Sequence, residues 1–153
     1  MDWQSLFFSF KGRINRGKYW LAVLVFFIVG IVLALMGFVL GNGLVVQVLS
    51  FIVNLAVFIA GLAVGIKRLH DRDKSAWWML VFYVVPVMLV AIGAFIAFFG
   101  ASATGTTEDT ATLLFRVCIV AAIAIGVWAF VEFGCLRGTV GYNRFGPDPV
   151  AKA

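Results

Sequence analysis

Residues 21–66 decide the fold, and they read LAVLVFFIVGIVLALMGFVL, then GNG, then LVVQVLSFIVNLAVFIAGLAVGI. The stretch contains two uncharged apolar blocks, residues 21–40 and 44–66, of 20 and 23 residues. A helix that crosses the hydrocarbon core of a bilayer needs about 20 apolar residues, so each block is long enough to span a membrane. Because only residues 41–43 link the blocks, the stretch predicts an antiparallel hairpin of two membrane-spanning helices.

Two more apolar blocks follow. Residues 77–99 are 23 residues without a charge, whereas residues 113–136 carry Arg116 near the start and Glu132 near the end. These two charges are 16 residues apart, about 24 Å along a helix, so each can lie within a turn of a membrane interface. The connection 100–112, rich in Thr, Gly and Ala, is predicted to be a mobile exposed loop. The expected spans are therefore about 20–40, 44–66, 77–99 and 113–136.

The composition agrees with a membrane protein. The 153 residues are 63% apolar and 12% charged, against about 45–50% and about 25% in a soluble domain. A soluble chain of this size lacks the polar residues to cover such an excess. We therefore expect residues 1–153 to form a single membrane domain. No cleavable signal peptide is evident, because the first apolar block starts near residue 20 and is long enough to span, so we expect the N-terminal segment to be retained.

The first residues predict a further short helix. Trp3, Leu6, Phe7 and Phe10 follow the i, i+3, i+4, i+7 spacing of one helical face, and Asp2 is placed to cap it. We expect an amphipathic helix at about 2–11 that lies in the membrane interface. The predicted fold class is thus an all-α integral membrane protein with four transmembrane helices and a short N-terminal interfacial amphipathic helix.

The cations predict the orientation. Eleven of the twelve Lys and Arg residues precede the first span, lie between the second and third, or follow the fourth; the twelfth is Arg116. Under the positive-inside rule, both termini and the tail 137–153 are then cytoplasmic.

Small and polar residues within the spans predict helix packing. In the second block they recur on one helical stripe that we expect to face protein, and the first block has a similar stripe of small residues. The residues singled out are Gln47, Asn54, Gly61, Gly65, Gly37 and Gly41. The alternative interpretation is a polar lining for a permeation path. Pro86 removes a backbone donor inside the third block, so we expect a kink there.

Three polar motifs lie in the segments predicted to be cytoplasmic. They begin with Gly12-Arg13-Ile14-Asn15-Arg16, Lys67-Arg68-Leu69-His70-Asp71 and Gly138-Thr139-Val140-Gly141-Tyr142, and the third continues through Asn143-Arg144-Phe145-Gly146-Pro147-Asp148-Pro149. In this order they resemble the bacterial inner-membrane family called domain of unknown function 805, over nearly the whole chain. Mild departures are Lys67 for the first arginine of the middle motif, Asp73 and Ala76 where glycines are usual, and Phe145 for tyrosine. The resemblance implies a small multi-pass protein of the bacterial inner (cytoplasmic) membrane and brings no established activity.

The residues themselves favour a structural role over catalysis. His70 and Asp71 are neighbours, so on a helix they point about 100° apart and form no relay with each other. One histidine with scattered carboxylates is a weak metal constellation, and we expect no catalytic residue, metal or cofactor. Glu132 near the end of a span needs a cation, and Arg68, Arg13 and Arg137 are candidates. We also expect the tail to fold back on the loop around His70 and Asp71.

The candidate cytoplasmic polar cluster combines these motifs. Its members are Arg13, Arg16, Arg68, His70, Asp71, Glu132, Arg137, Asn143, Arg144 and Asp148. The favoured function is a non-enzymatic scaffold or accessory protein whose basic face binds anionic lipid headgroups or a membrane protein partner, which includes a second copy of the chain. The alternative is a small transporter or channel subunit with a polar path through the bundle. Nucleic acid is not an expected partner, because the positive charges alternate with membrane spans.

Overall fold

The computed structural model describes residues 3–41, 43–103 and 108–150. These ranges are helical apart from the connections, the C-terminal tail and an isolated bridge between Asn143 and Gly146. The helices are α1 (Trp3–Phe8), α2 (Arg16–Leu40), α3 (Leu44–Asp71), α4 (Val85–Ala103) and α5 (Glu108–Phe130), with π-helical segments η1 (Leu80–Val84) and η2 (Val131–Cys135). Within the described ranges, four stretches are long and apolar enough to cross a membrane: Arg16–Leu40, Leu44–Asp71, Leu80–Phe99 and Thr110–Cys135. The predicted all-helical fold with four spans and a short N-terminal helix is confirmed.

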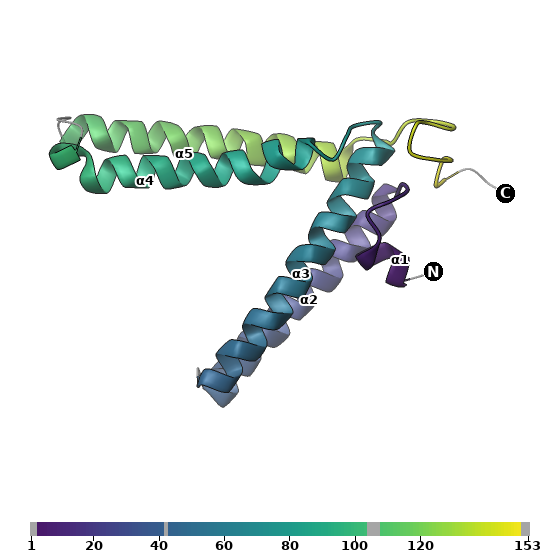
Figure 1. The fold of residues 1–153 in the computed structure, drawn as a ribbon, viewed down its shortest axis with the longest axis horizontal. Coiled ribbons are helices and arrows are strands. Elements are labelled where there is room, and N and C mark those ends of the chain that lie inside the picture. The colour runs from purple at the N-terminus through teal and green to yellow at the C-terminus, as the bar shows by residue number, and fades with distance from the viewer. Residues whose placement is uncertain (1–2, 42, 104–107, 151–153) are drawn as a thin grey trace. The chain divides into compact units, whose positions relative to one another are not determined.

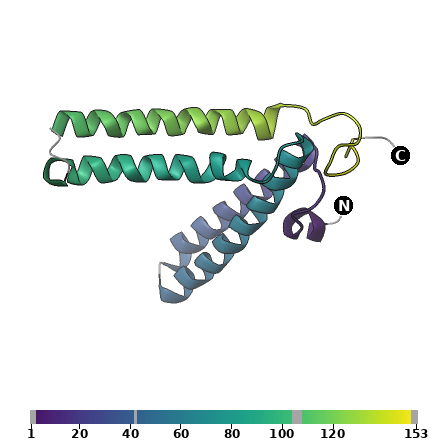
Figure 2. The ribbon, with the colours of Figure 1, turned by 45° about the horizontal axis from the view of Figure 1, so that its top comes forward.

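The chain divides into two compact units. The first comprises Met1–Ala76 and Leu136–Ala153, and the second comprises Trp77–Cys135. In the first unit α2 and α3 run side by side as the predicted hairpin, and α1 lies against α3 (Figures 1 and 2). In the second unit α4 and α5 form another closely packed pair. That residues 1–153 act as one membrane domain stays a prediction.

Local signals in the sequence set the ends of α2. The side chain of Asn15 accepts a hydrogen bond from the backbone N–H of Lys18 at 2.9 Å, which satisfies one of the free donors at the start of the helix. The helix ends at Leu40, where Gly41 takes a positive φ of 76° that favours glycine. Gly41, predicted to pack between helices, instead forms this turn, because no atom beyond its chain neighbours approaches its Cβ position within 4 Å.

Two helix boundaries in the first unit differ from prediction. Helix α3 continues to Asp71, five residues past the predicted end at 66, with its last five residues buried. Helix α1 ends at Phe8, so Phe10 lies beyond it. The buried Lys67 ammonium donates hydrogen bonds to the carbonyls of Ser5 and Leu6, each at 2.5 Å, which are the groups that residues 9 and 10 would bond in a longer helix. The cap predicted at Asp2 lies outside the described residues.

The second unit is tightly packed around Gly93. A Cβ at Gly93 would lie 2.9 Å from the Cβ of Cys118 and 3.1 Å from the ring of Phe115, so glycine allows α4 to approach α5. Both helices also extend further than predicted, because α4 reaches Ala103 and α5 begins at Glu108. The loop predicted over 100–112 is therefore wrong at both ends, and its centre, residues 104–107, lies outside the described residues.

The disturbance expected at Pro86 takes the form of a π-helical turn. The backbone N–H of Val85 bonds to the carbonyl of Leu80, five residues earlier, and Pro86 itself has no N–H to donate to Phe82. Shifting the pairing by one residue lets the helix absorb the missing donor. The ring of Phe82 packs edge-on against Trp128 at 5.1 Å and Phe133 at 5.3 Å between ring centroids, which anchors this turn within the second unit.

Candidate functional site

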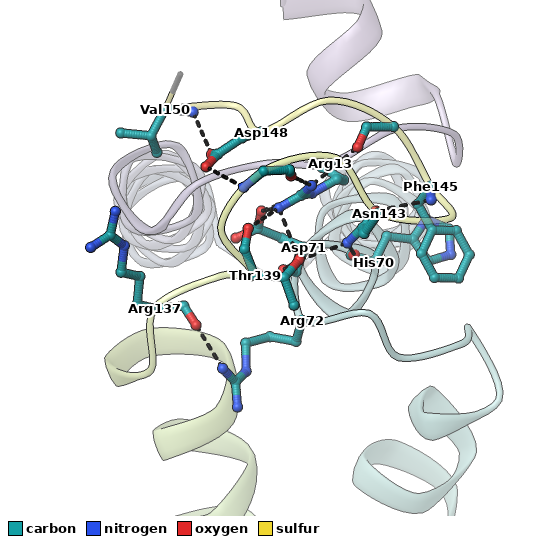
Figure 3. Close-up of polar contacts among 12 residues, drawn as sticks. Arg13, His70, Asp71, Arg72, Arg137, Thr139, Asn143, Phe145, Asp148 and Val150 are labelled. Atoms are coloured by element: carbon teal, nitrogen blue, oxygen red, sulfur yellow. Dashed lines mark hydrogen bonds and ion pairs between the residues drawn. The ribbon is translucent and has the colours of Figure 1, made fainter. Parts of the chain in front are cut away.

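The three polar motifs meet at one end of the α2–α3 pair. We call this region the polar layer and define it as residues 9–18, 67–76 and 136–150. Its centre is the guanidinium of Arg13, which Figure 3 shows between the end of α3 and the folded tail. Arg13 donates to the carbonyls of Thr139 at 2.6 Å, Gly141 at 2.8 Å and Gly146 at 3.1 Å. A planar guanidinium with five donors thus fixes the path of the tail.

Asp71 supplies the negative charge of the layer. Its carboxylate lies 3.1 Å from Nη2 of Arg13 and 2.5 Å from Nη1 of Arg68, and all three side chains are at most 3% exposed. Arg68 also donates to the carbonyl of Leu136 at the start of the tail. Two buried guanidinium groups therefore share one carboxylate, and the loss of Asp71 would leave both without that compensation.

The tail begins with a tight approach to Asp71. The backbone N–H of Thr139 donates to the Asp71 carbonyl at 2.8 Å, and the Thr139 hydroxyl donates to the same oxygen at 3.1 Å. A Cβ at Gly138 would overlap the Asp71 carboxylate. Glycine at position 138 is therefore required by space and not by backbone conformation, since its φ is not positive.

The contact predicted between the tail and the loop after α3 is present. Asn143 donates from Nδ2 to the carbonyl of His70 at 2.9 Å and to the Thr139 hydroxyl at 2.8 Å. The ring of Phe145 stacks on that of His70, with centroids 3.9 Å apart and planes 6° from parallel. Nδ1 of His70 lies 3.3 Å from the carbonyl oxygen of Gly12. The histidine thus bridges all three motifs by packing and hydrogen bonding.

Arg144 forms the exposed part of this contact. Its Nε lies 3.1 Å from the carboxylate of Asp73, and its guanidinium carbon lies 4.9 Å from the Phe145 ring centroid. Asp73 has a φ of 56°, a left-handed conformation that glycine adopts freely and aspartate tolerates better than most residues. This conformation accounts for the turn at a position where the resembled family usually has glycine.

Asp148 stabilises the tail itself and does not dock on the loop. Its carboxylate accepts hydrogen bonds from the backbone N–H groups of Val150 at 2.9 Å and Gly141 at 3.2 Å. These two donors, the Val150 N–H first, hold the pKa of the Asp148 carboxyl below its ordinary value. The carboxylate closes the tail into a compact loop.

Three predicted members of the cluster lie apart from its buried centre. Arg16 and Arg137 are exposed and line a polar cavity of about 190 Å³ together with Asp71 and Asp148. The Arg137 carbonyl accepts from Nη1 of Arg72 at 2.6 Å. Glu132 is buried in η2 of the second unit, and its pairing with an arginine stays a prediction.

Sequence reasoning missed Lys67, Gly138 and Thr139 as members of the site. Lys67 fastens α1 to α3, as described above, and its backbone carbonyl also accepts from the N–H of Ile14 at 3.4 Å. No spacing in the sequence signals these contacts, because each joins segments 60 or more residues apart. The Arg68–Asp71 pair does have a signal, since residues three apart face each other on a helix.

The packing residues are partly placed as predicted. Gly37 and Gln47 line an open groove of about 310 Å³ formed by α2 and α3, and the Cβ position of Gly61 is 3.9 Å from the Phe26 ring of α2. Gly65 is buried. Asn54 is exposed, and its amide donates to the Ser50 carbonyl of its own helix at 2.7 Å. The interhelical hydrogen bond expected from Asn54 is therefore replaced by one within α3.

The polar layer is built to hold three segments together and to present cations. No buried side-chain nitrogen or oxygen lacks a hydrogen-bond partner in the described part of the chain, and no three His, Cys, Asp or Glu side chains gather there as metal ligands would. The exposed cations attract anions by charge alone.

Comparison with known proteins identifies relatives along nearly the whole chain. The chain is 32% identical to the inner membrane protein YhaH of Escherichia coli, over 97% of both chains. It is 31% identical to the inner membrane protein YhaI of the same organism, over 92% of this chain and 86% of the relative. The uncharacterized E. coli protein YiiR is 30% identical over 97% and 90%. No solved structure matches.

The family model described as a protein of unknown function, DUF805, matches residues 7–147, which include all three motifs of the polar layer. This chain is therefore a small multi-pass inner membrane protein that belongs to the DUF805 family.

Proposed function

We propose that this protein is a non-enzymatic accessory protein of the inner membrane whose polar layer lies in the cytoplasm and binds anionic lipid. The observation that carries the proposal is a division of labour among the cations. Arg13, Lys67 and Arg68 are buried and donate to groups within the layer. Other cations remain exposed around them, and they are Lys11, Arg16, Lys18, Arg137 and Arg144.

The buried half of this arrangement supports a structural role. The polar side chains at its centre bond to one another and to backbone carbonyls of α1, α3 and the tail, and the His70 ring is covered by Phe145. A reactive acid, base or nucleophile would need access to a substrate. A rigid frame that fixes the exposed cations in place accounts for the same residues without any reaction.

The exposed half supports an orientation and a ligand class. The start of α2, the end of α3 and the tail lie together, so the positive charges of these segments share one end of the first unit. The positive-inside rule places such an end in the cytoplasm. Anionic headgroups of that leaflet attract each nearby Lys or Arg by about 1 kcal/mol, or about fivefold in affinity.

The lipid preference can be tested with spin-labelled lipids. The purified full-length protein is reconstituted in phosphatidylcholine, and the association of labelled phosphatidylglycerol and phosphatidylcholine with the protein is compared by electron paramagnetic resonance. We expect a preference for phosphatidylglycerol that weakens in high salt and that falls severalfold in the Arg16→Gln/Arg137→Gln variant. Arg116→Gln removes a cation outside the layer and is the control. Equal association of both lipids with the wild-type protein would refute the proposal.

The orientation needs a separate measurement. A reporter that is active only in the cytoplasm is fused after Ala153, and a second reporter that is active only outside is fused at the same place. We expect activity from the first fusion alone. Activity from the second alone would place the polar layer on the opposite side of the membrane.

A further inference from the structure

A polar cavity lies beside α1 in the first unit. It has a volume of about 250 Å³, several times the roughly 30 Å³ that one water occupies in the liquid. Its lining residues are Ser5, Leu6, Lys11, Gly12, Arg13, Ile14, Lys18 and Lys67. Arg13 and Lys67 are buried and already donate to backbone carbonyls, whereas Lys11 and Lys18 are exposed. The two exposed ammonium groups make this cavity suited to an anion.

The position of Lys18 adds to this suitability. It lies in the first turn of α2, whose N-cap is Asn15. The free N–H groups and the dipole at the start of a helix favour negative charge within about one turn. A phosphate in the cavity would therefore meet Lys11, Lys18 and the positive end of a 25-residue helix.

An apolar groove adjoins the same short helix. It has a volume of about 290 Å³ and is lined by Phe7, Phe8, Val25, Phe26, Val29, Ile52, Val53, Ala56, Val57 and Ala60. These residues come from α1, α2 and α3, and the Phe7 and Phe26 rings pack with centroids 5.6 Å apart. The groove is therefore a cleft between packed helices with an entirely apolar lining.

The cavity and the groove follow each other in membrane depth. Along α2, Val25 and Val29 line the groove 7 and 11 residues after Lys18 lines the cavity, or about 10 and 16 Å at 1.5 Å per residue. Along α3, which runs the opposite way, Ala60 lines the groove 7 residues before Lys67 lines the cavity. The cationic cavity thus lies at headgroup level and the groove extends from it into the hydrocarbon.

We propose that the cavity and the groove together form a binding site for one anionic phospholipid. Its phosphate would lie between Lys11 and Lys18, and one acyl chain would fill the groove against Phe7, Phe8 and Ala56. An anionic phospholipid matches both spaces, because its phosphate is joined through glycerol to an apolar chain. The inference rests on the proposed anionic-lipid preference and narrows it from a general attraction to a single site of defined stoichiometry.

Native mass spectrometry of the full-length protein in detergent tests the headgroup half. The probes are phosphatidylglycerol and phosphatidylcholine with identical acyl chains. We expect the wild-type protein to retain one phosphatidylglycerol at concentrations where it retains no phosphatidylcholine. Lys11→Gln/Lys18→Gln should weaken this binding at least tenfold. Arg16→Gln/Arg137→Gln removes two charges from the same layer but from the other cavity, and it should change binding less than threefold.

A second pair of variants tests the groove. Ala56→Trp places a large side chain in the groove and should weaken phosphatidylglycerol binding at least tenfold. Leu55→Trp adds a similar side chain at the next position of α3, which is 49% exposed and does not line the groove, and should leave binding unchanged. Circular dichroism and gel filtration of each variant establish that it is folded before binding is measured.

The outcomes separate the site from the proposed function. If Lys11→Gln/Lys18→Gln retains the lipid as the wild type does, the site is wrong, while the general preference measured with spin-labelled lipids still stands. If Ala56→Trp and Leu55→Trp bind equally, no acyl chain occupies the groove and the proposal of a phospholipid site is wrong. If the wild-type protein binds both lipids equally in both experiments, the site and the proposed function fail together.

Discussion

Replacing Gly138 by alanine should destabilise the first unit more than a single added methyl group usually does. The new Cβ would overlap the Asp71 carboxylate, which is short and is held by Arg13 and Arg68. The carboxylate cannot swing aside without weakening one of these contacts, because its side chain is buried among its partners. The alternative is a backbone shift at the start of the tail, which would move Thr139 away from Asp71.

Both routes have similar costs. Overpacking a buried site costs about 1–3 kcal/mol, and the loss of one hydrogen bond to a charged group costs about 1.5–3 kcal/mol. We therefore expect Gly138→Ala to lower the free energy of unfolding by about 3 kcal/mol. For a chain of this size about 3 kcal/mol corresponds to a Tm lower by roughly 6–12 °C.

Thermal unfolding in a mild detergent measures the effect. Gly30→Ala is the matched control, since a Cβ at that position of α2 meets nothing within 4 Å, and its Tm should stay within about 2 °C of the wild type. An Asp71→Ala background supplies a double-mutant cycle, in which adding Gly138→Ala should cost little because the obstructing carboxylate is gone. Equal Tm values for Gly138→Ala and Gly30→Ala would refute the reasoning.

Three further predictions follow from contacts described above. Lys67→Met removes the donors that hold α1, so labelling of a cysteine introduced into α1 should become at least severalfold faster, whereas Lys67→Arg should largely preserve protection. Gly93→Ala should lower the Tm of the second unit by several degrees because α4 and α5 must separate, and Gly126→Ala, with open space at its Cβ, should not. The depressed pKa of Asp148 means that its contribution is present above the ordinary carboxyl pKa and is lost as pH falls through the lower folded value. Hydrogen exchange at the Gly141 amide should therefore show protection near neutral pH that disappears in strong acid, and unchanged relative protection in acid would contradict this linkage.

The spans could be predicted from the sequence because apolar length is a local property. Residues 21–40 and 44–66 identify two spans without reference to any other part of the chain. The ends were harder to place, since Lys67 to Asp71 are too polar for a span when considered alone. Helix α3 includes them because Arg68 faces Asp71 one turn away and Lys67 meets the carbonyls of α1. Their cost depends on partners that apolar length does not encode.

The candidate site was predictable as a set of motifs and not as a geometry. The sequence analysis correctly placed Asn143 and Arg144 against the loop after α3. It did not assign Asp71 as the shared partner of Arg13 and Arg68, because attention went to Glu132, the acidic residue nearest the end of a span. It also did not identify Gly138, whose requirement for glycine arises from a carboxylate 67 positions away and not from its own φ.

The reach of Arg13 along the chain has a consequence for biosynthesis. Its guanidinium bonds to Thr139, Gly141 and Gly146, which are 126, 128 and 133 residues further on. At about 5–20 residues per second, the ribosome needs roughly 6–25 s to make the first of these partners after Arg13. During that time all four spans have been synthesised, while the arginine still relies on water or lipid headgroups for its hydrogen bonds. The polar layer can therefore close only after the last span has left the ribosome, so its closure marks the completion of membrane insertion.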